Sequence, residues 1–151
     1  MSGMILPFGK VLPKVADDAF IAPNATLIGD VEIGSQSSIW FQCVLRGDVN
    51  DIRVGKRTNI QDGTIVHVTG NIQGCSIGDD ITIGHLSLIH ACTLQDGCFI
   101  GMKSTVMDLA VVEAGAMVAI AAAIVAFVAV VIVGYFAQRL EASEETPVRL
   151  A

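Results

Sequence analysis

Aliphatic residues return at almost every sixth position along most of this chain. The series consists of Ile21, Leu27, Ile33, Ile39 and Leu45, then Val54, Ile60 and Val66, then Ile77, Ile83, Ile89, Leu94, Ile100, Val106 and Val112. A period of six differs from the helical period of 3.6 and from the strand period of two. It is typical of hexapeptide-repeat β-helices, so the pattern predicts an all-β fold of stacked parallel coils.

In such a fold each hexad forms one side of a triangular prism, and three sides make a coil of about eighteen residues. Each aliphatic side chain points inward and stacks on its counterpart in the next coil, about 4.8 Å away. Small and polar residues are expected at the corners, where turn conformations are needed. The corner candidates are Gly29-Asp30, Gly55, Gly63, Gly78-Asp79-Asp80 and Asp96-Gly97.

The repeat divides the chain into three segments. We assign residues 1–19 to an N-terminal lead-in, residues 20–133 to the β-helix domain, and residues 134–151 to a tail containing a short C-terminal helix. Such a helix would cover the open end of the prism, where exposed strand edges invite pairing with other chains. The hexad phase slips at residues 51–53 and again between Val68 and Ser76, where the composition predicts an outward loop.

The run from Ala116 to Val133 is wholly apolar, and no charged residue occurs between Glu113 and Arg139. By hydropathy alone the run is a candidate membrane-spanning helix. The hexad phase continues through it, however, and neither flank carries a basic cluster that would anchor a span. We therefore predict further β-coils here, with a membrane helix as the open alternative.

Composition narrows the function classes. The chain has 151 residues, which suits one domain, and its formal net charge of −6 argues against a nucleic-acid partner. Its cysteines form no CxxC pair, and no secretory segment is recognised at the beginning of the sequence. We expect free, partly buried thiols in a cytoplasmic protein, with a cysteine metal site as the alternative. The cysteines are Cys43, Cys75, Cys92 and Cys98.

The three histidines, His67, His85 and His90, are the principal candidates for chemistry. Counting prism sides places His67 and His85 on one face in successive coils and His90 on the next face, so all three would lie near one edge. Three neutral imidazoles with an open fourth position are what a catalytic zinc requires. The alternative is three unrelated surface or packing histidines. Because the chain has no other histidine, we favour a metal site.

Polar motifs accompany the histidines. Arg46 and Asp48 occur in Leu45-Arg46-Gly47-Asp48, and Gln61 and Asp62 occur in Asn59-Ile60-Gln61-Asp62-Gly63. Arg46 and Asp48 are expected to pair with each other or across chains. Together with His67, Ile83-Gly84-His85 and His90, these motifs resemble the γ-class carbonic anhydrase-like proteins over roughly residues 15–115.

The resemblance implies a left-handed parallel β-helix that forms a homotrimer with metal sites between subunits. It implies that His67 and His90 of one chain and His85 of its neighbour hold Zn²⁺, although a three-histidine site also accepts Fe²⁺ or Co²⁺. Gln61 would hydrogen-bond the zinc-bound hydroxide that attacks carbon dioxide, and Arg46, Asp48 and Asp62 would form polar links around the site. The expected substrates are carbon dioxide and bicarbonate, with no nucleic acid or membrane partner.

The sequence also departs from that family. Active members carry a glutamate directly after the position of Asp48 and another in the loop after the first histidine; this chain has Val49 and an acid-free loop. Both acids are associated with proton transfer. A catalytically weak metal-binding scaffold or assembly subunit is therefore one alternative function. A hexapeptide-repeat acyltransferase, which uses a histidine as its base, is the other.

Overall fold

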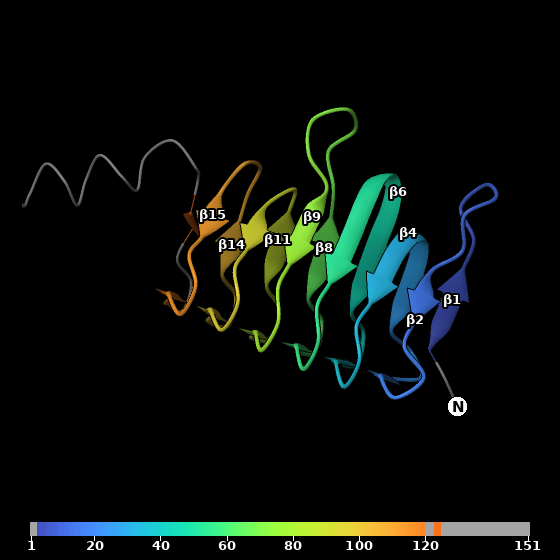
Figure 1. The fold of residues 1–151 in the computed structure, drawn as a ribbon, viewed down its shortest axis with the longest axis horizontal. Coiled ribbons are helices and arrows are strands. Elements are labelled where there is room, and N and C mark those ends of the chain that lie inside the picture. The colour runs from blue at the N-terminus through green and yellow to red at the C-terminus, as the bar shows by residue number, and fades with distance from the viewer. Residues whose placement is uncertain (1–2, 120–122, 125–151) are drawn as a thin grey trace, which may run out of the picture.

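The computed structural model describes residues 3–119 and 123–124, and within them the chain is all-β. The strands pair in parallel and form the stacked coils of a left-handed β-helix, whose coils follow one another along the long axis in Figure 1. The predicted fold class is thereby confirmed. The helix predicted within residues 134–151 lies outside the described residues.

Most strands are short because each occupies only one side of the prism. They are β1 (Met4–Leu6), β2 (Lys14–Val15), β3 (Phe20–Ile21), β4 (Thr26–Ile33), β5 (Ser38–Ile39), β6 (Val44–Val54), β7 (Asn59–Ile60), β8 (Ile65–His67), β9 (Cys75–Ile77), β10 (Thr82–Ile83), β11 (Leu88–His90), β12 (Thr93–Leu94), β13 (Phe99–Ile100), β14 (Thr105–Val106), β15 (Val111–Val112), β16 (Met117–Val118) and β17 (Ala123–Ile124).

Strand pairing defines the three sides. The first side is the six-stranded sheet β3-β5-β7-β10-β13-β16. The second side joins the beginnings of β4 and β6 to β8, β11, β14 and β17, and the third joins their ends to β9, β12 and β15. The two long strands, β4 and β6, therefore continue across a corner.

The core consists of one inward column from each side. Every member is at most 6% exposed, which confirms the inward positions predicted from the hexads. The columns are Ile21, Ile39, Ile60, Ile83, Ile100 and Val118; Leu27, Leu45, Val66, Ile89 and Val106; and Ile33, Val54, Ile77, Leu94 and Val112.

Both predicted phase slips correspond to insertions. Within β6, the register against β4 shifts between the pairs Gly29–Gly47 and Val31–Ile52, so the first slip widens a corner without ending the strand. The second slip is the outward loop, residues 68–74, which projects from the stack between β8 and β9 in Figure 1. A bridge between Thr69 and Gln73 closes the base of this loop.

The ladder extends toward both ends of the chain. Inside the lead-in, β1 and β2 already pair in parallel with β4. Inside the apolar run, β16 and β17 pair with β13 and β14 in the hexad phase, as predicted for β-coils. The rest of the run to Val133 lies outside the described residues. Among residues 3–119 and 123–124, there is no helix with the length and apolar character that a membrane crossing requires.

The corners use more residue types than expected. Gly63, Gly97 and Asp80 have positive φ, as expected of corner residues, but so do Leu86 and Leu109. The expectation that small or polar residues supply the corners is therefore incomplete. Backbone hydrogen bonds to a neighbouring coil hold the larger residues: the amides of Leu86 and Leu109 donate to the carbonyls of Asp62 and Ala91, at 2.9 and 2.8 Å.

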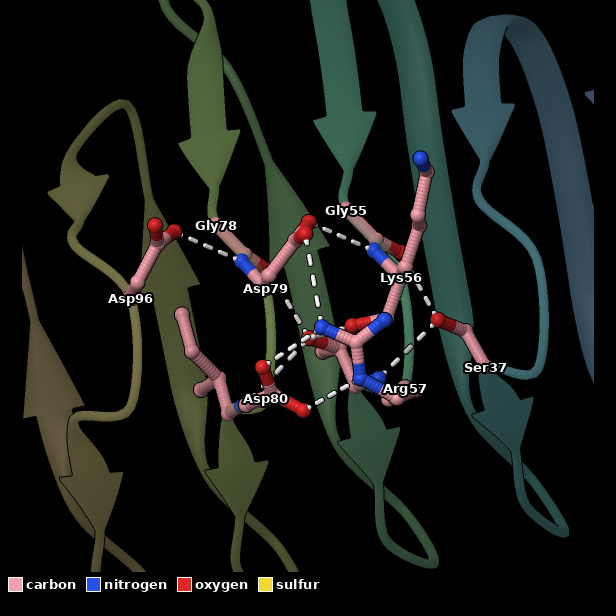
Figure 2. A network of polar contacts seen from close by, with 10 residues as sticks. Ser37, Gly55, Lys56, Arg57, Gly78, Asp79, Asp80 and Asp96 are labelled. Atoms are coloured by element: carbon pink, nitrogen blue, oxygen red, sulfur yellow. Dashed lines mark hydrogen bonds and ion pairs between the residues drawn. The ribbon is translucent and has the colours of Figure 1, made fainter.

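One corner carries a ladder of aspartates, drawn in Figure 2. Oδ1 of Asp79 accepts a hydrogen bond from the amide of Lys56, and Oδ1 of Asp96 accepts one from the amide of Asp79, each at 2.8 Å. Beside them the Arg57 guanidinium donates to both carboxylate oxygens of Asp80, at 2.6 and 2.7 Å. At this corner, Asp79 and Asp96 thus each cap an amide of the preceding coil.

The cysteines are free and buried, as expected. Burial raises the pKa of Cys98 to about 11, and the pKa of Cys92 is raised by its contact with Cys75 and by burial. Across the described residues, no group of three or more His, Cys, Asp or Glu side chains is arranged to hold a metal within one chain.

Candidate functional site

Three predicted site residues form one outward column on the second side of the prism. Arg46 of β6 pairs in register with His67 of β8, and His67 pairs with His90 of β11. The prediction that His67 and His85 share a face in successive coils is wrong. The outward loop adds residues after His67 without advancing around the prism, so the register partner one coil later is His90. His85 lies instead in the turn between β10 and β11, at the corner between the first and second sides.

The first histidine of the column is held by Asp48. Nε2 of His67 lies 3.0 Å from Oδ1 of Asp48, and the Arg46 guanidinium donates to Oδ2 of the same carboxylate. Burial alone would raise the pKa of Asp48, but hydrogen bonds from His67, a backbone amide and Arg46 outweigh it and hold that pKa below its usual value. The predicted pairing of Arg46 with Asp48 is therefore formed within one chain, and Asp48 stays ionised at neutral pH.

The second histidine is held by Asp108, which the sequence analysis missed. Nδ1 of His90 lies 2.7 Å from Oδ1 of Asp108, and the Thr69 hydroxyl donates to Oδ2. The Thr69 hydrogen bond is the main cause that lowers the pKa of Asp108, with His90 adding to it against the effect of burial. A sequence signal was present: Asp108 follows His90 by 18 residues, the expected length of one coil.

His85 and Asp62 form a separate pair at the adjacent corner. Nδ1 of His85 lies 2.9 Å from Oδ2 of Asp62, and both side chains are nearly half exposed. Gln61 directly precedes Asp62 and is fixed through its backbone, since its amide donates to the Ile83 carbonyl at 2.9 Å. The structure thus brings Arg46, Asp48, His67 and His90 together and places Gln61, Asp62 and His85 beside one another on a neighbouring corner.

These contacts determine which ring nitrogens are free. An ionised carboxylate only accepts hydrogen bonds, so Nε2 of His67 and Nδ1 of His90 must be the donors. In the neutral rings, Nδ1 of His67 and Nε2 of His90 then carry lone pairs, and these two atoms lie 3.0 Å apart. Two nitrogens bound to one tetrahedral zinc at about 2.0–2.1 Å are about 3.3 Å apart. The pair is therefore close to the geometry of two ligands of one metal.

The chain is similar in sequence to proteins named carbonic anhydrases. The chain is 52% identical over 112 residues to gamma carbonic anhydrase 2, mitochondrial, of Arabidopsis thaliana, a match that covers 71% of this chain and 40% of that protein. It is 46% identical over 82 residues to a carbonic anhydrase of Geobacillus kaustophilus, covering 54% of this chain and 44% of the relative. The chain thus spans less than half the length of these relatives.

A solved structure matches over almost the whole length. The hexapeptide transferase family protein from Anaplasma phagocytophilum aligns with a TM-score of 0.62 and 34% identity, covering 92% of this chain and 93% of that one. No family model matches the chain. With histidines and carboxylates arranged as described, and with these similarities in sequence and in fold, the chain belongs to the family of carbonic anhydrase-like hexapeptide-repeat proteins.

Proposed function

We propose that this chain is a carbonic anhydrase-like metalloprotein that hydrates carbon dioxide reversibly at sites shared between the subunits of a homotrimer. His67 and His90 of one chain and His85 of its neighbour would hold a divalent metal, with zinc as the first candidate. Support for the substrate comes from the named activities of the relatives in Arabidopsis thaliana and Geobacillus kaustophilus.

The observation that carries this proposal is the convergence of two acceptor nitrogens. His67 Nδ1 and His90 Nε2 lie 3.0 Å apart, and neither has a proton to offer the other when both rings are neutral. The two lone pairs therefore repel each other, and a cation bound by both of them removes this repulsion. His85, whose Nδ1 faces Asp62, likewise leaves its Nε2 free on a half-exposed side chain that a second chain can reach. A shared site also accounts for the lack of a three-ligand group among the described residues of one chain.

The residues around this centre have distinct tasks in the proposed reaction. When bound, the metal supplies a Lewis acid that lowers the pKa of water to about 7, a value known from carbonic anhydrases in general. Asp48, Asp62 and Asp108 accept the outer N–H of each histidine and so keep the inner nitrogens unprotonated. Gln61, at the corner of His85, would orient the attacking water by a hydrogen bond from its side-chain amide.

A metal-binding scaffold without significant turnover is the second candidate, and a specific observation favours it. Val49, where the resemblance to the γ-class proteins implies a glutamate, is 54% exposed beside Asp48, and the outward loop has no acid to accept a proton. Such a protein would hold the same metal but hydrate carbon dioxide no faster than the uncatalysed reaction.

Complementation between two inactive variants tests whether the site is shared. The two variants are His67→Ala and His85→Ala, produced separately and also co-expressed. A shared site lies between a chain that keeps His67 and a neighbour that keeps His85, so every mixed trimer regains one intact site and neither pure trimer has any. Metal content and carbon dioxide hydration are measured on the same samples, with the exposed corner variant Arg57→Ala as the control for general effects of substitution.

The outcomes separate the candidates. Bound metal that is lost in each variant and partly restored by co-expression, together with hydration that follows it, supports the proposal. Restored metal without hydration identifies the scaffold. Metal retained in His85→Ala, or no restoration on co-expression, contradicts a shared three-histidine site. An acyltransferase would contain no stoichiometric metal at all.

A further inference from the structure

The outward loop reaches the candidate metal centre through the Thr69 side chain. Thr69 donates its hydroxyl proton to Oδ2 of Asp108, and Oδ1 of the same carboxylate faces Nδ1 of His90 at 2.7 Å. We propose that Thr69 and Asp108 are positioning residues that orient His90 for metal binding, so that the outward loop is a structural part of the centre. This inference rests on the proposed function, because it assigns His90 as a metal ligand.

Thr69 is well suited to be the fixed end of this relay. Its carbonyl accepts hydrogen bonds from the amides of Ile72 and Gln73, at 3.4 and 3.3 Å, and its amide donates to the Gln73 carbonyl at 3.2 Å. From the neighbouring strand β6, the Asn50 side-chain amide also donates to the Thr69 carbonyl at 3.2 Å. The backbone of Thr69 is therefore held from both sides, and its hydroxyl has a defined direction.

Asp108 needs such a donor because it lies in a corner turn and is about one-third exposed. With Oδ2 fixed by Thr69, Oδ1 keeps its position opposite His90 and selects the Nδ1–H tautomer of that ring. Outer hydrogen bonds of this kind fix the orientation and the basicity of metal-binding histidines. The arrangement parallels that of His67, where Asp48 is fixed by Arg46 instead.

The two histidines of the column are therefore oriented from different parts of the fold. Arg46 and Asp48 both belong to β6, whereas Thr69 comes from the loop and Asp108 from the turn after β14. The Thr69 hydroxyl therefore acts on His90 through Asp108, whereas the carboxylate that faces His67 is fixed by Arg46. The outward loop contains no Asp or Glu, so the contribution proposed for it is geometric.

A pair of threonine variants in the full-length protein tests the relay. Thr69→Val keeps the shape and removes the hydroxyl, whereas Thr69→Ser keeps the hydroxyl. Ile72→Ala, at an exposed position in the same loop, is the control for effects on the loop as a whole. Zinc and cobalt affinities are measured by chelator competition, and the cobalt absorption spectrum reports coordination geometry. The ring tautomers are read without metal from ¹⁵N-histidine NMR, which has only three histidines to resolve.

We expect Thr69→Val to lose about 10–100-fold in metal affinity, with an altered cobalt spectrum and a smaller population of the His90 Nδ1–H tautomer. Thr69→Ser and Ile72→Ala should match the wild type. Wild-type affinity and spectrum in Thr69→Val would overturn the inference while leaving the metal site intact. If the wild-type protein binds no metal, the proposed function fails, and an unchanged His90 tautomer in Thr69→Val would then overturn the relay independently.

Discussion

Replacing Gly55 by alanine tests how closely adjacent coils approach at the aspartate corner in Figure 2. A Cβ at Gly55 would lie 2.6 Å from both the carbonyl carbon and the carbonyl oxygen of Gly78, and 2.3 Å from Oδ1 of Asp79. The first two contacts are with backbone, which can yield only if the coils separate. The third is with the carboxylate that caps the Lys56 amide at 2.8 Å, so the substitution also displaces that hydrogen bond.

The magnitude follows from these two effects. Forcing an extra carbon into a close-packed contact typically costs about 1–3 kcal/mol. Losing the hydrogen bond to the Lys56 amide adds about 0.5–1.5 kcal/mol, at the lower end because the Asp79 side chain is 38% exposed. Gly55 does not have the positive φ that would add backbone strain. We therefore expect Gly55→Ala to lower the free energy of unfolding by about 2–4 kcal/mol.

Urea unfolding at a fixed protein concentration measures this change, because a shifted midpoint with an unchanged slope reports stability alone. Asp79→Ala is the matched control, since it removes the cap without adding a carbon at Gly55. Its expected cost is about 1 kcal/mol. If Gly55→Ala costs no more than Asp79→Ala, the Gly78 peptide yields freely and the close-approach argument is refuted.

Four further outcomes are expected. Ile83→Ala, in the centre of a buried column, should destabilise the protein by about 2–5 kcal/mol in the same unfolding assay, whereas its outward neighbour Thr82→Ala should cost far less. Cys98, with its pKa raised to about 11 by burial, should react slowly with a thiol reagent at pH 8 in the native protein and rapidly after denaturation; equal rates would contradict its burial. In the homotrimer proposed above, Arg46→Ala should give smaller species in sedimentation, and an unchanged assembly would show that this arginine serves elsewhere. A chain whose residues 116–133 form β-coils should stay in the soluble fraction without detergent, and resistance to carbonate extraction would favour a membrane span instead.

The core could be predicted from sequence because the same requirement, an aliphatic residue at the inward position, recurs in every hexad. Each inward position, such as Ile60 or Ile83, needs only an aliphatic residue six places from the last, and β-branched side chains suit a strand. The corners were predicted less well. A left-handed turn at Leu86 or Leu109 is stabilised by hydrogen bonds to the preceding coil, and these are not encoded in the residue types themselves.

The site was predicted by residue type better than by position. His67 and His90 are recognisable as candidates, but counting hexads places them on different sides of the prism, whereas they share one side. The count fails because the outward loop adds residues without advancing the chain around the prism. Asp108 was missed for a related reason. Its contact with His90 joins two coils, and a carboxylate in a corner turn looks in sequence like any other turn residue.

The base of the outward loop makes the register of the two coils independent of the length of the chain between them. His67 and His90 are 23 residues apart in the chain but are register partners across a single coil. The Thr69–Gln73 bridge closes the loop at its base, so residues added beyond it leave that register unchanged. Doubling the length of a flexible loop costs only about 0.6 kcal/mol. Insertions and deletions at the loop tip can therefore change the surface beside the candidate site during evolution. The β-ladder beneath the loop meanwhile preserves the spacing of the two histidines.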